Sequence, residues 1–182
     1  MKKKIMALLL AALLLTGCGV QNATPAPTET EPTEAKSTEA AKLQVPDFTV
    51  YDVQGNAVKL SDYFGKPIVL NFWASWCGPC KMEMPDFNEK YLELGQDVQF
   101  LMINLTDGTS ETVETASSFI AAQGYSFPVL YDTTGEAANT YGIYSIPTTI
   151  FIDAQGYGVA QATGAISGDT LQKGIDMITG NP

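Results

Sequence analysis

From about residue 43 onward, strand-like and helix-like patterns of apolar positions alternate along the chain. Continuous apolar runs at 68–72 and 98–103 predict two strands that are buried on both faces. Apolar residues at helical spacing predict a helix from 77 or 78 to 94, with Pro85 in its interior. The remaining pattern predicts helices at 61–64, 110–123, 134–141 and 167–178, and strands at 45–51, 58–60, 127–131, 146–152 and 157–163.

The order of these elements is β-β-α-β-α-β-α-β-α-β-β-α, where the first helix is short. This alternation predicts an α/β fold with a central mixed β-sheet and helices on its faces. Pro128 cannot donate a hydrogen bond to a neighbouring strand, so the 127–131 strand is expected to lie at an edge or to start irregularly.

The first 17 residues have the pattern of a signal peptide, with lysines at 2–4 followed by an apolar run at 5–15. That run is too short for a comfortable membrane span. It ends in Leu-Thr-Gly-Cys at 15–18, which resembles the lipobox of bacterial lipoproteins, where the cysteine is lipidated after cleavage. We therefore expect Cys18 to anchor the protein by acyl chains on the extracytoplasmic face of the cell membrane. An ordinary secretory signal is the alternative.

Residues 18–42 are rich in Thr, Pro, Glu and Ala and have little apolar bulk, so they are expected to form a disordered tether. Residues 43–182 are then enough for one domain with its own core. The whole chain carries a formal charge of −10 and contains no arginine. This composition argues against nucleic acid and anionic lipid headgroups as partners.

Cys77 and Cys80 are the only cysteines left once Cys18 is assigned to the lipid. They lie where a buried strand ends and a helix begins, and the free N–H groups and dipole of a helix start favour a reactive thiolate. A structural zinc site needs four ligands, but the chain has no histidine and no second cysteine pair. A disulfide across two residues adds little chain-entropy stabilisation. Redox chemistry is the hypothesis that remains.

The motif Phe-Trp-Ala-Ser-Trp-Cys-Gly-Pro-Cys at 72–80 resembles the active-site motif of the thioredoxin superfamily. Ile-Pro-Thr at 146–148 is similar to the cis-proline segment of that fold. The front end at 46–67, and the extra strand and helix at 98–124, resemble the TlpA/ResA branch of membrane-tethered thioredoxins. The resemblance covers essentially the whole folded region, and it implies a thioredoxin-like fold and a thiol-disulfide oxidoreductase without a cofactor beyond the cysteine pair.

Cys77 is expected to be the nucleophile that attacks a partner's disulfide, because it lies at the helix start. Cys80, one turn later, then resolves the mixed disulfide. Gly78 and Pro79 set the loop between the two sulfur atoms, and Gly-Pro is the sequence of a reducing thioredoxin. Trp76 is expected to pack beside the sulfur atoms.

Pro147 and Trp73 have further expected roles, and that of Pro147 follows from the resemblance. Pro147 is expected to be cis and to face the cysteines, so that the main chain of Ile146 pairs with a substrate segment in β fashion. Trp73 is expected to be a core residue that anchors the strand end.

The residue that accepts the proton of Cys80 must differ from that in thioredoxin. Thioredoxin has a buried aspartate where this chain has Asn71, and an amide does not exchange protons. Glu83 lies one helical turn after Cys80 and matches a glutamate of the ResA-type proteins. Burial there would raise the pKa of the Glu83 carboxyl and let it act as a base, whereas a solvated glutamate is the alternative.

The predicted function is an extracytoplasmic reductase of protein disulfides, of the type that supports cytochrome c maturation or a methionine sulfoxide reductase. The resemblance also implies a membrane thiol carrier of the CcdA/DsbD kind as electron donor, and we expect a monomer. A peroxiredoxin-like thiol peroxidase is an alternative, but Ala74 stands where that family has threonine and no arginine is present. A copper chaperone of the Sco type would need a histidine. A non-enzymatic, lipid-tethered binding protein is a further class.

Overall fold

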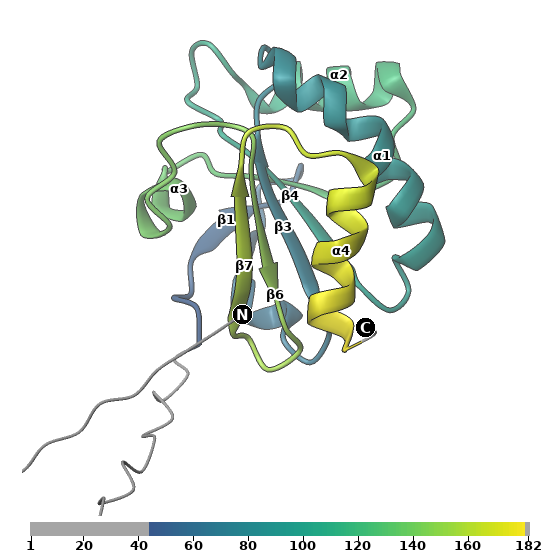
Figure 1. Cartoon of the computed structure of the whole chain (residues 1–182). Coiled ribbons are helices and arrows are strands. Elements are labelled where there is room, and N and C mark those ends of the chain that lie inside the picture. The colour runs from purple at the N-terminus through teal and green to yellow at the C-terminus, as the bar shows by residue number, and fades with distance from the viewer. Residues whose placement is uncertain (1–43, 181–182) are drawn as a thin grey trace, which may run out of the picture. The chain divides into compact units, whose positions relative to one another are not determined.

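The computed structural model describes residues 44–180, which form a mixed α/β fold with a central sheet (Figure 1). The strands of this part of the chain are β1 (Thr49–Tyr51), β2 (Ala57–Lys59), β3 (Ile68–Trp73), β4 (Gln99–Asn104), β5 (Val129–Tyr131), β6 (Thr148–Ile152) and β7 (Gly158–Thr163). Its helices are the 3-10 helix η1 (Leu60–Tyr63), α1 (Gly78–Leu94), α2 (Val113–Gln123), α3 (Glu136–Thr140) and α4 (Gly168–Thr179). The order of elements matches the sequence prediction. The signal peptide, the tether and Cys18 lie outside the described residues.

The sheet has the strand order β2-β1-β5-β4-β3-β6-β7 and mixes parallel and antiparallel pairs. Strand β3 lies next to β4 in parallel and next to β6 in antiparallel orientation, and all six of its residues are buried. Successive residues of a strand point to opposite faces, so Ile68 and Phe72 contribute to one hydrophobic cluster while Val69 and Trp73 contribute to the other. The motif that follows β3 therefore begins from the rigid centre of the sheet.

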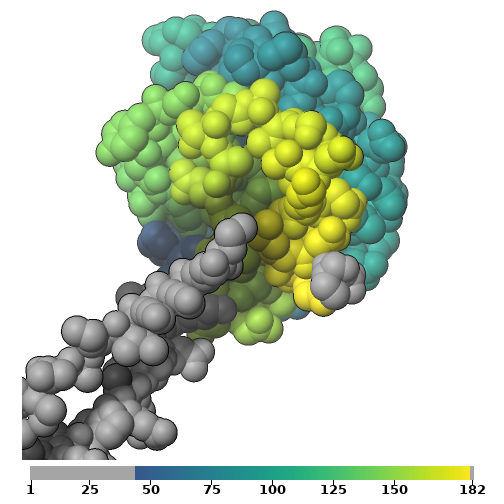
Figure 2. Space-filling model, viewed as in Figure 1, coloured from purple at the N-terminus to yellow at the C-terminus, as the bar shows by residue number. Residues whose placement is uncertain are grey.

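Helices α1, α2 and α4 pack on one face of the sheet, and α3 and η1 pack on the other (Figure 1). Helices α4 and α1 lie side by side on the same face of the sheet (Figure 2). The backbone of α4 comes so close to the sheet at Gly174 that any β-carbon there would collide with the ring of Phe151. This close approach packs α4 tightly against the sheet on the face that carries α1.

Two sequence predictions about element positions need correction. The strand that follows Pro128 is not an edge strand, because β5 lies between β1 and β4. It does start irregularly: the strand begins at Val129, and the proline carbonyl accepts a hydrogen bond from the Met102 N–H at 3.4 Å. Helix α2 begins at Val113 rather than Ser110, since Thr112 caps it through its hydroxyl.

Candidate redox site

Cys77 and Cys80 form a disulfide at the start of α1. Cys77 is the N-cap residue of the helix, and its Sγ accepts a hydrogen bond from the main-chain N–H of Cys80 at 3.2 Å. Pro79 occupies the first turn, where its missing N–H costs no helical hydrogen bond. After reduction, a thiolate on Cys77 would receive the same N–H and the positive end of the helix dipole, both of which lower the pKa of a thiol.

The two cysteines differ in their access to solvent. Cys77 retains 4% of its surface exposed, whereas Cys80 is completely buried. A partner sulfur must approach in line with the sulfur that it meets, so only Cys77 offers an approach from outside. This difference favours Cys77 as the attacking residue and Cys80 as the internal one.

The segment before β6, which contains Ile146 and Pro147, lies beside Cys77. The Ile146–Pro147 peptide bond is cis, as the resemblance implied. The Ile146 carbonyl oxygen lies 3.7 Å from the Sγ of Cys77. Within the described residues, the main-chain N–H of Ile146 has no hydrogen-bond partner. This N–H, beside the disulfide, is therefore available to pair with the main chain of another protein.

Glu83 is buried, with only 2% of its surface exposed, so the solvated alternative for this residue is wrong. Its Oε1 accepts a hydrogen bond from Asn71 Nδ2 at 2.8 Å, and its Oε2 accepts one from the Ile166 N–H at 2.9 Å. Burial raises the pKa of the Glu83 carboxyl to about 7, against the lowering effect of these two hydrogen bonds, and nearby Asp86 raises it further. The carboxyl is therefore poised to exchange a proton near neutral pH.

Asn71 allows Glu83 to change its protonation state without losing a hydrogen bond. Asn71 Nδ2 also donates to Thr149 Oγ1 at 3.0 Å, while Asn71 Oδ1 is buried and unpaired. If the amide turns over, Oδ1 faces both neighbours and accepts from a protonated Glu83 and from the Thr149 hydroxyl. In the sequence, Asn71 stands out only as a missing acid, and the pairing with Glu83 and Thr149 has no local signal because these partners are 12 and 78 residues away.

Three large apolar side chains that are close in sequence to Cys77, Cys80 or Ile146 are exposed: Trp76, Met82 and Tyr144. Trp76 is 59% exposed, so it is not a core residue, whereas Trp73 is fully buried as expected. Tyr144 is 98% exposed and lies two residues before Ile146. Burial could not be read from the sequence for these residues, since an aromatic residue suits a core and a contact surface equally well.

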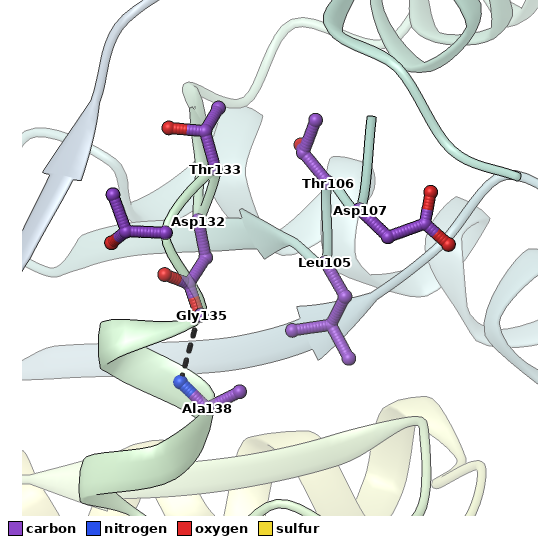
Figure 3. A pocket seen from close by; sticks show the side chains of 8 residues that line it. Leu105, Thr106, Asp107, Asp132, Thr133, Gly135 and Ala138 are labelled. Carbon is purple, nitrogen blue, oxygen red and sulfur yellow. Dashed lines mark hydrogen bonds between the residues drawn. The ribbon is translucent and has the colours of Figure 1, made fainter. Parts of the chain in front are cut away.

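A recess of about 330 Å³ lies at the carboxyl ends of β4 and β5 (Figure 3). It is lined by Leu105, Thr106, Asp107, Asp132, Thr133, Thr134, Gly135 and Ala138. Its two carboxylates already serve the fold: Asp132 accepts two N–H groups of α3, and Asp107 accepts N–H groups that lower its pKa to about 2. We therefore place no reacting group in this recess.

Comparison with known proteins fits this site. The sequence profile of the AhpC/TSA family matches residues 41–157. The chain belongs to the AhpC/TSA family. ResA of Bacillus thuringiensis subsp. konkukian, a thiol-disulfide oxidoreductase, is 34% identical over 139 residues, which are 75% of this chain and 77% of ResA.

Solved structures agree with this membership in the AhpC/TSA family. The exposed lipoprotein thioredoxin Etrx1 of Streptococcus pneumoniae is 37% identical, with a TM-score of 0.60 over 72% of this chain and 99% of that one. StoA of Bacillus subtilis is 26% identical, with a TM-score of 0.62 over 72% of this chain and 97% of that one. Together with the Cys77–Cys80 disulfide, these matches make the protein a thioredoxin-like thiol-disulfide oxidoreductase, whose redox group is the cysteine pair itself.

Two observations concern other kinds of site. Residues 44–180 contain no cluster of three or more His, Cys, Asp or Glu side chains arranged to hold a metal ion. None of the helices in this part of the chain combines the length and apolar character that a membrane crossing requires.

Proposed function

We propose that the protein reduces disulfide bonds of partner proteins outside the cytoplasmic membrane, through the dithiol form of Cys77 and Cys80. The observation that carries this proposal is the position of Cys77, which caps α1, has access to solvent and lies beside the free main chain of Ile146. A purely structural disulfide would need neither the access nor the adjacent pairing groups.

The reaction begins with the Cys77 thiolate, which attacks one sulfur of the partner's disulfide. That bond breaks, a bond forms between Cys77 Sγ and the partner sulfur, and the released partner thiolate takes up a proton. Cys80 then gives its proton to the Glu83 carboxylate and attacks Cys77 Sγ, which releases the second partner thiolate. This thiolate takes up a proton from the solvent, and Glu83 later returns its proton to the solvent. The partner gains two electrons and two protons, and Cys77 and Cys80 become the disulfide.

Main-chain pairing with Ile146 holds the partner segment during this exchange. An extended segment that aligns with Ile146 brings its cysteine to Cys77 Sγ, which is 3.7 Å from the Ile146 carbonyl oxygen. The exposed side chains of Trp76, Met82 and Tyr144 supply apolar contacts around it. The partners that this surface suits are therefore proteins with an extended, accessible cysteine segment.

The test of the function is turnover. The reduced full-length protein is expected to reduce the disulfides of insulin and to be regenerated by dithiothreitol, which is followed by precipitation of the insulin B chain. A rate no faster than dithiothreitol alone would favour the lipid-tethered binding protein instead. Consumption of hydrogen peroxide at a catalytic rate would favour the peroxidase, which the AhpC/TSA membership keeps as a second candidate despite Ala74.

The partners follow from the same proposal. A reductant outside the cytoplasm needs electrons from inside, so a membrane thiol carrier of the CcdA/DsbD kind would restore the dithiol. The substrates would be apocytochromes c that need reduced cysteines, or a methionine sulfoxide reductase that needs electrons. ResA and StoA, which resemble this chain, support a place in this group of oxidoreductases.

Residues 18–42 would act as a tether that holds this chemistry at the membrane surface. The resemblance of residues 15–18 to a lipobox, and the likeness to a lipoprotein thioredoxin of Streptococcus pneumoniae, support a lipid on Cys18. Cys18→Ala should therefore leave the membrane fraction or persist as an uncleaved precursor, as immunoblots of fractionated cells would show. Equal membrane retention of a cleaved Cys18→Ala protein would contradict the lipid anchor.

Glu83→Gln is expected to change how stability depends on pH. The carboxyl has a pKa of 4.5 in the unfolded chain and about 7 in the folded protein. Below pH 4.5 it is neutral in both states; between 4.5 and 7 only the unfolded chain ionises, so the wild-type protein loses stability as the pH rises. The loss totals about 3 kcal/mol, and Glu83→Gln should escape it, as urea unfolding of the oxidised proteins from pH 4 to 8 would measure.

The exposed Glu89 on the same helix provides the matched control, and Glu89→Gln should follow the wild-type curve. The role of Glu83 as a base has its own measurement: in Glu83→Gln, alkylation of the reduced Cys80 should depend differently on pH. If that pH dependence matches the wild type, Glu83 is not the proton acceptor of Cys80.

A further inference from the structure

Glu111 is a completely buried carboxylate in the loop between β4 and α2. Its Oε1 accepts hydrogen bonds from the Ser75 N–H at 2.7 Å and from Asn104 Nδ2 at 2.6 Å. Its Oε2 accepts one from the Ser75 hydroxyl at 2.6 Å. The ion pair found in residues 44–180 joins Lys90 and Glu93, so the charge of Glu111 is balanced by neutral donors and not by a cation. A buried charge is costly, and its retention calls for a role.

Two of these three hydrogen bonds reach the turn that delivers Cys77. Ser75 lies inside this turn, in which the Cys77 N–H donates to the Ala74 carbonyl oxygen at 3.1 Å. The third bond reaches Asn104, the last residue of β4, which pairs with Trp73 at the end of β3. Glu111 therefore joins the end of one central strand to the turn that leaves the other.

The loop that carries Glu111 is itself fixed. Asp107 Oδ1 accepts the main-chain N–H of Glu111 at 3.0 Å, and the Gly108 N–H donates to the carbonyl oxygen of Glu111. Thr106 donates its hydroxyl to Asn104 Oδ1 at 2.7 Å, which orients the Asn104 amide toward Glu111. The carboxylate is thus held in one position against Ser75, which lies two residues before Cys77 in the sequence.

We propose that Glu111 is a positioning residue of the redox centre: its carboxylate fixes the turn that carries Cys77, and its buried negative charge disfavours the Cys77 thiolate. Because a disfavoured thiolate weakens the reduced state, the charge makes the cysteine pair a stronger reductant. This inference rests on the proposed function as a reductase. It concerns a residue in the loop between β4 and α2, whereas Glu83 lies in α1. The step also differs, since it is the ionisation of Cys77 and not the deprotonation of Cys80.

Glu111→Gln separates the charge from the hydrogen bonds. Glutamine has the same shape, and its Oε1 accepts from the Ser75 N–H and Asn104 Nδ2 as before. Its Nε2 donates to the Ser75 hydroxyl, which turns from donor to acceptor. The variant therefore keeps three hydrogen bonds and loses only the charge. Glu114→Gln is the matched control, because Glu114 is exposed on the adjoining helix.

The experiment uses the reduced full-length protein and follows alkylation of Cys77 by iodoacetamide against pH, with peptides resolved by mass spectrometry. In Glu111→Gln the midpoint is expected to fall by about one pH unit, a tenfold gain in thiolate below the midpoint. In glutathione buffers above that midpoint, the equilibrium should shift toward the dithiol. The free energy of unfolding should change little, and Glu114→Gln should match the wild type. The substitution changes none of the other titratable side chains of the surrounding segments: Lys81, Glu83, Asp107, Asp132 and Tyr144.

Ser75→Ala is the control for a change in the geometry of the turn without a change in charge. It removes one hydrogen bond to Glu111 and keeps the charge, so its midpoint should stay or rise. An unchanged or higher midpoint in Glu111→Gln, or an equal fall in Ser75→Ala, would overturn the proposal. Neither alkylation nor the glutathione equilibrium needs a protein partner, so a failure of insulin reduction would count against the proposed function and not against this role of Glu111.

Discussion

Replacement of Cys77 by serine is expected to abolish the reduction of insulin disulfides. A serine hydroxyl is not ionised at neutral pH and does not attack a disulfide, so the first bond between enzyme and partner cannot form. Cys80 cannot take over, because it is completely buried in the first turn of α1, whereas Cys77 has access to solvent. The rate of insulin B-chain precipitation with dithiothreitol should fall to the rate without protein.

The substitution should leave the fold intact, which makes the result interpretable. Serine is a preferred N-cap residue, and its hydroxyl replaces the sulfur as acceptor for the Cys80 N–H. The reduced wild-type protein is the matched reference for stability, since both proteins lack the disulfide. If the full-length Cys77→Ser protein retains even a tenth of the wild-type rate, Cys77 is not the required nucleophile.

Cys80→Ser has a different expected result: it should accumulate stable mixed disulfides with its partners. Cys77 still attacks the partner, but no second thiol is present to release it. Cells that express the full-length variant should show high-molecular-weight species on non-reducing gels, and these should disappear with dithiothreitol.

The reversed pattern is the sharpest contradiction. If Cys77→Ser traps partners while Cys80→Ser traps none, the roles of the two cysteines are inverted. The double variant is the control that should trap nothing. Mass spectrometry of the captured proteins would also decide between apocytochromes c, a methionine sulfoxide reductase and other partners.

The sequence predicted the sheet and the helices well because their signals are local. The apolar run of β3 and the helical spacing of α1 lie in continuous segments, and the structure has both where they were expected. The position of β5 was harder to predict. Pro128 argues for an edge, but the proline stands just outside the strand, where its missing N–H costs no pairing.

The site was predictable only as far as its residues are close in sequence. Cys77 and Cys80 stand one turn apart, and the cis bond before Pro147 followed from a recognised motif. The bonds of Glu83 to Asn71 and Ile166 span 12 and 83 residues, and that of Glu111 to Ser75 spans 36. Only the folded sheet brings these segments together, and a lone glutamate before a helix gives no sign that it will be buried.

The free main chain at Ile146 has a consequence for the choice of partners. Backbone groups are the same in every protein, so pairing through them recognises an extended conformation and is blind to the identity of the residues. Discrimination must then come from side chains, and the exposed Trp76, Met82 and Tyr144 are candidates for it. None of these three side chains carries a thiol, so substitutions at these positions can change the range of partners while the redox chemistry stays the same.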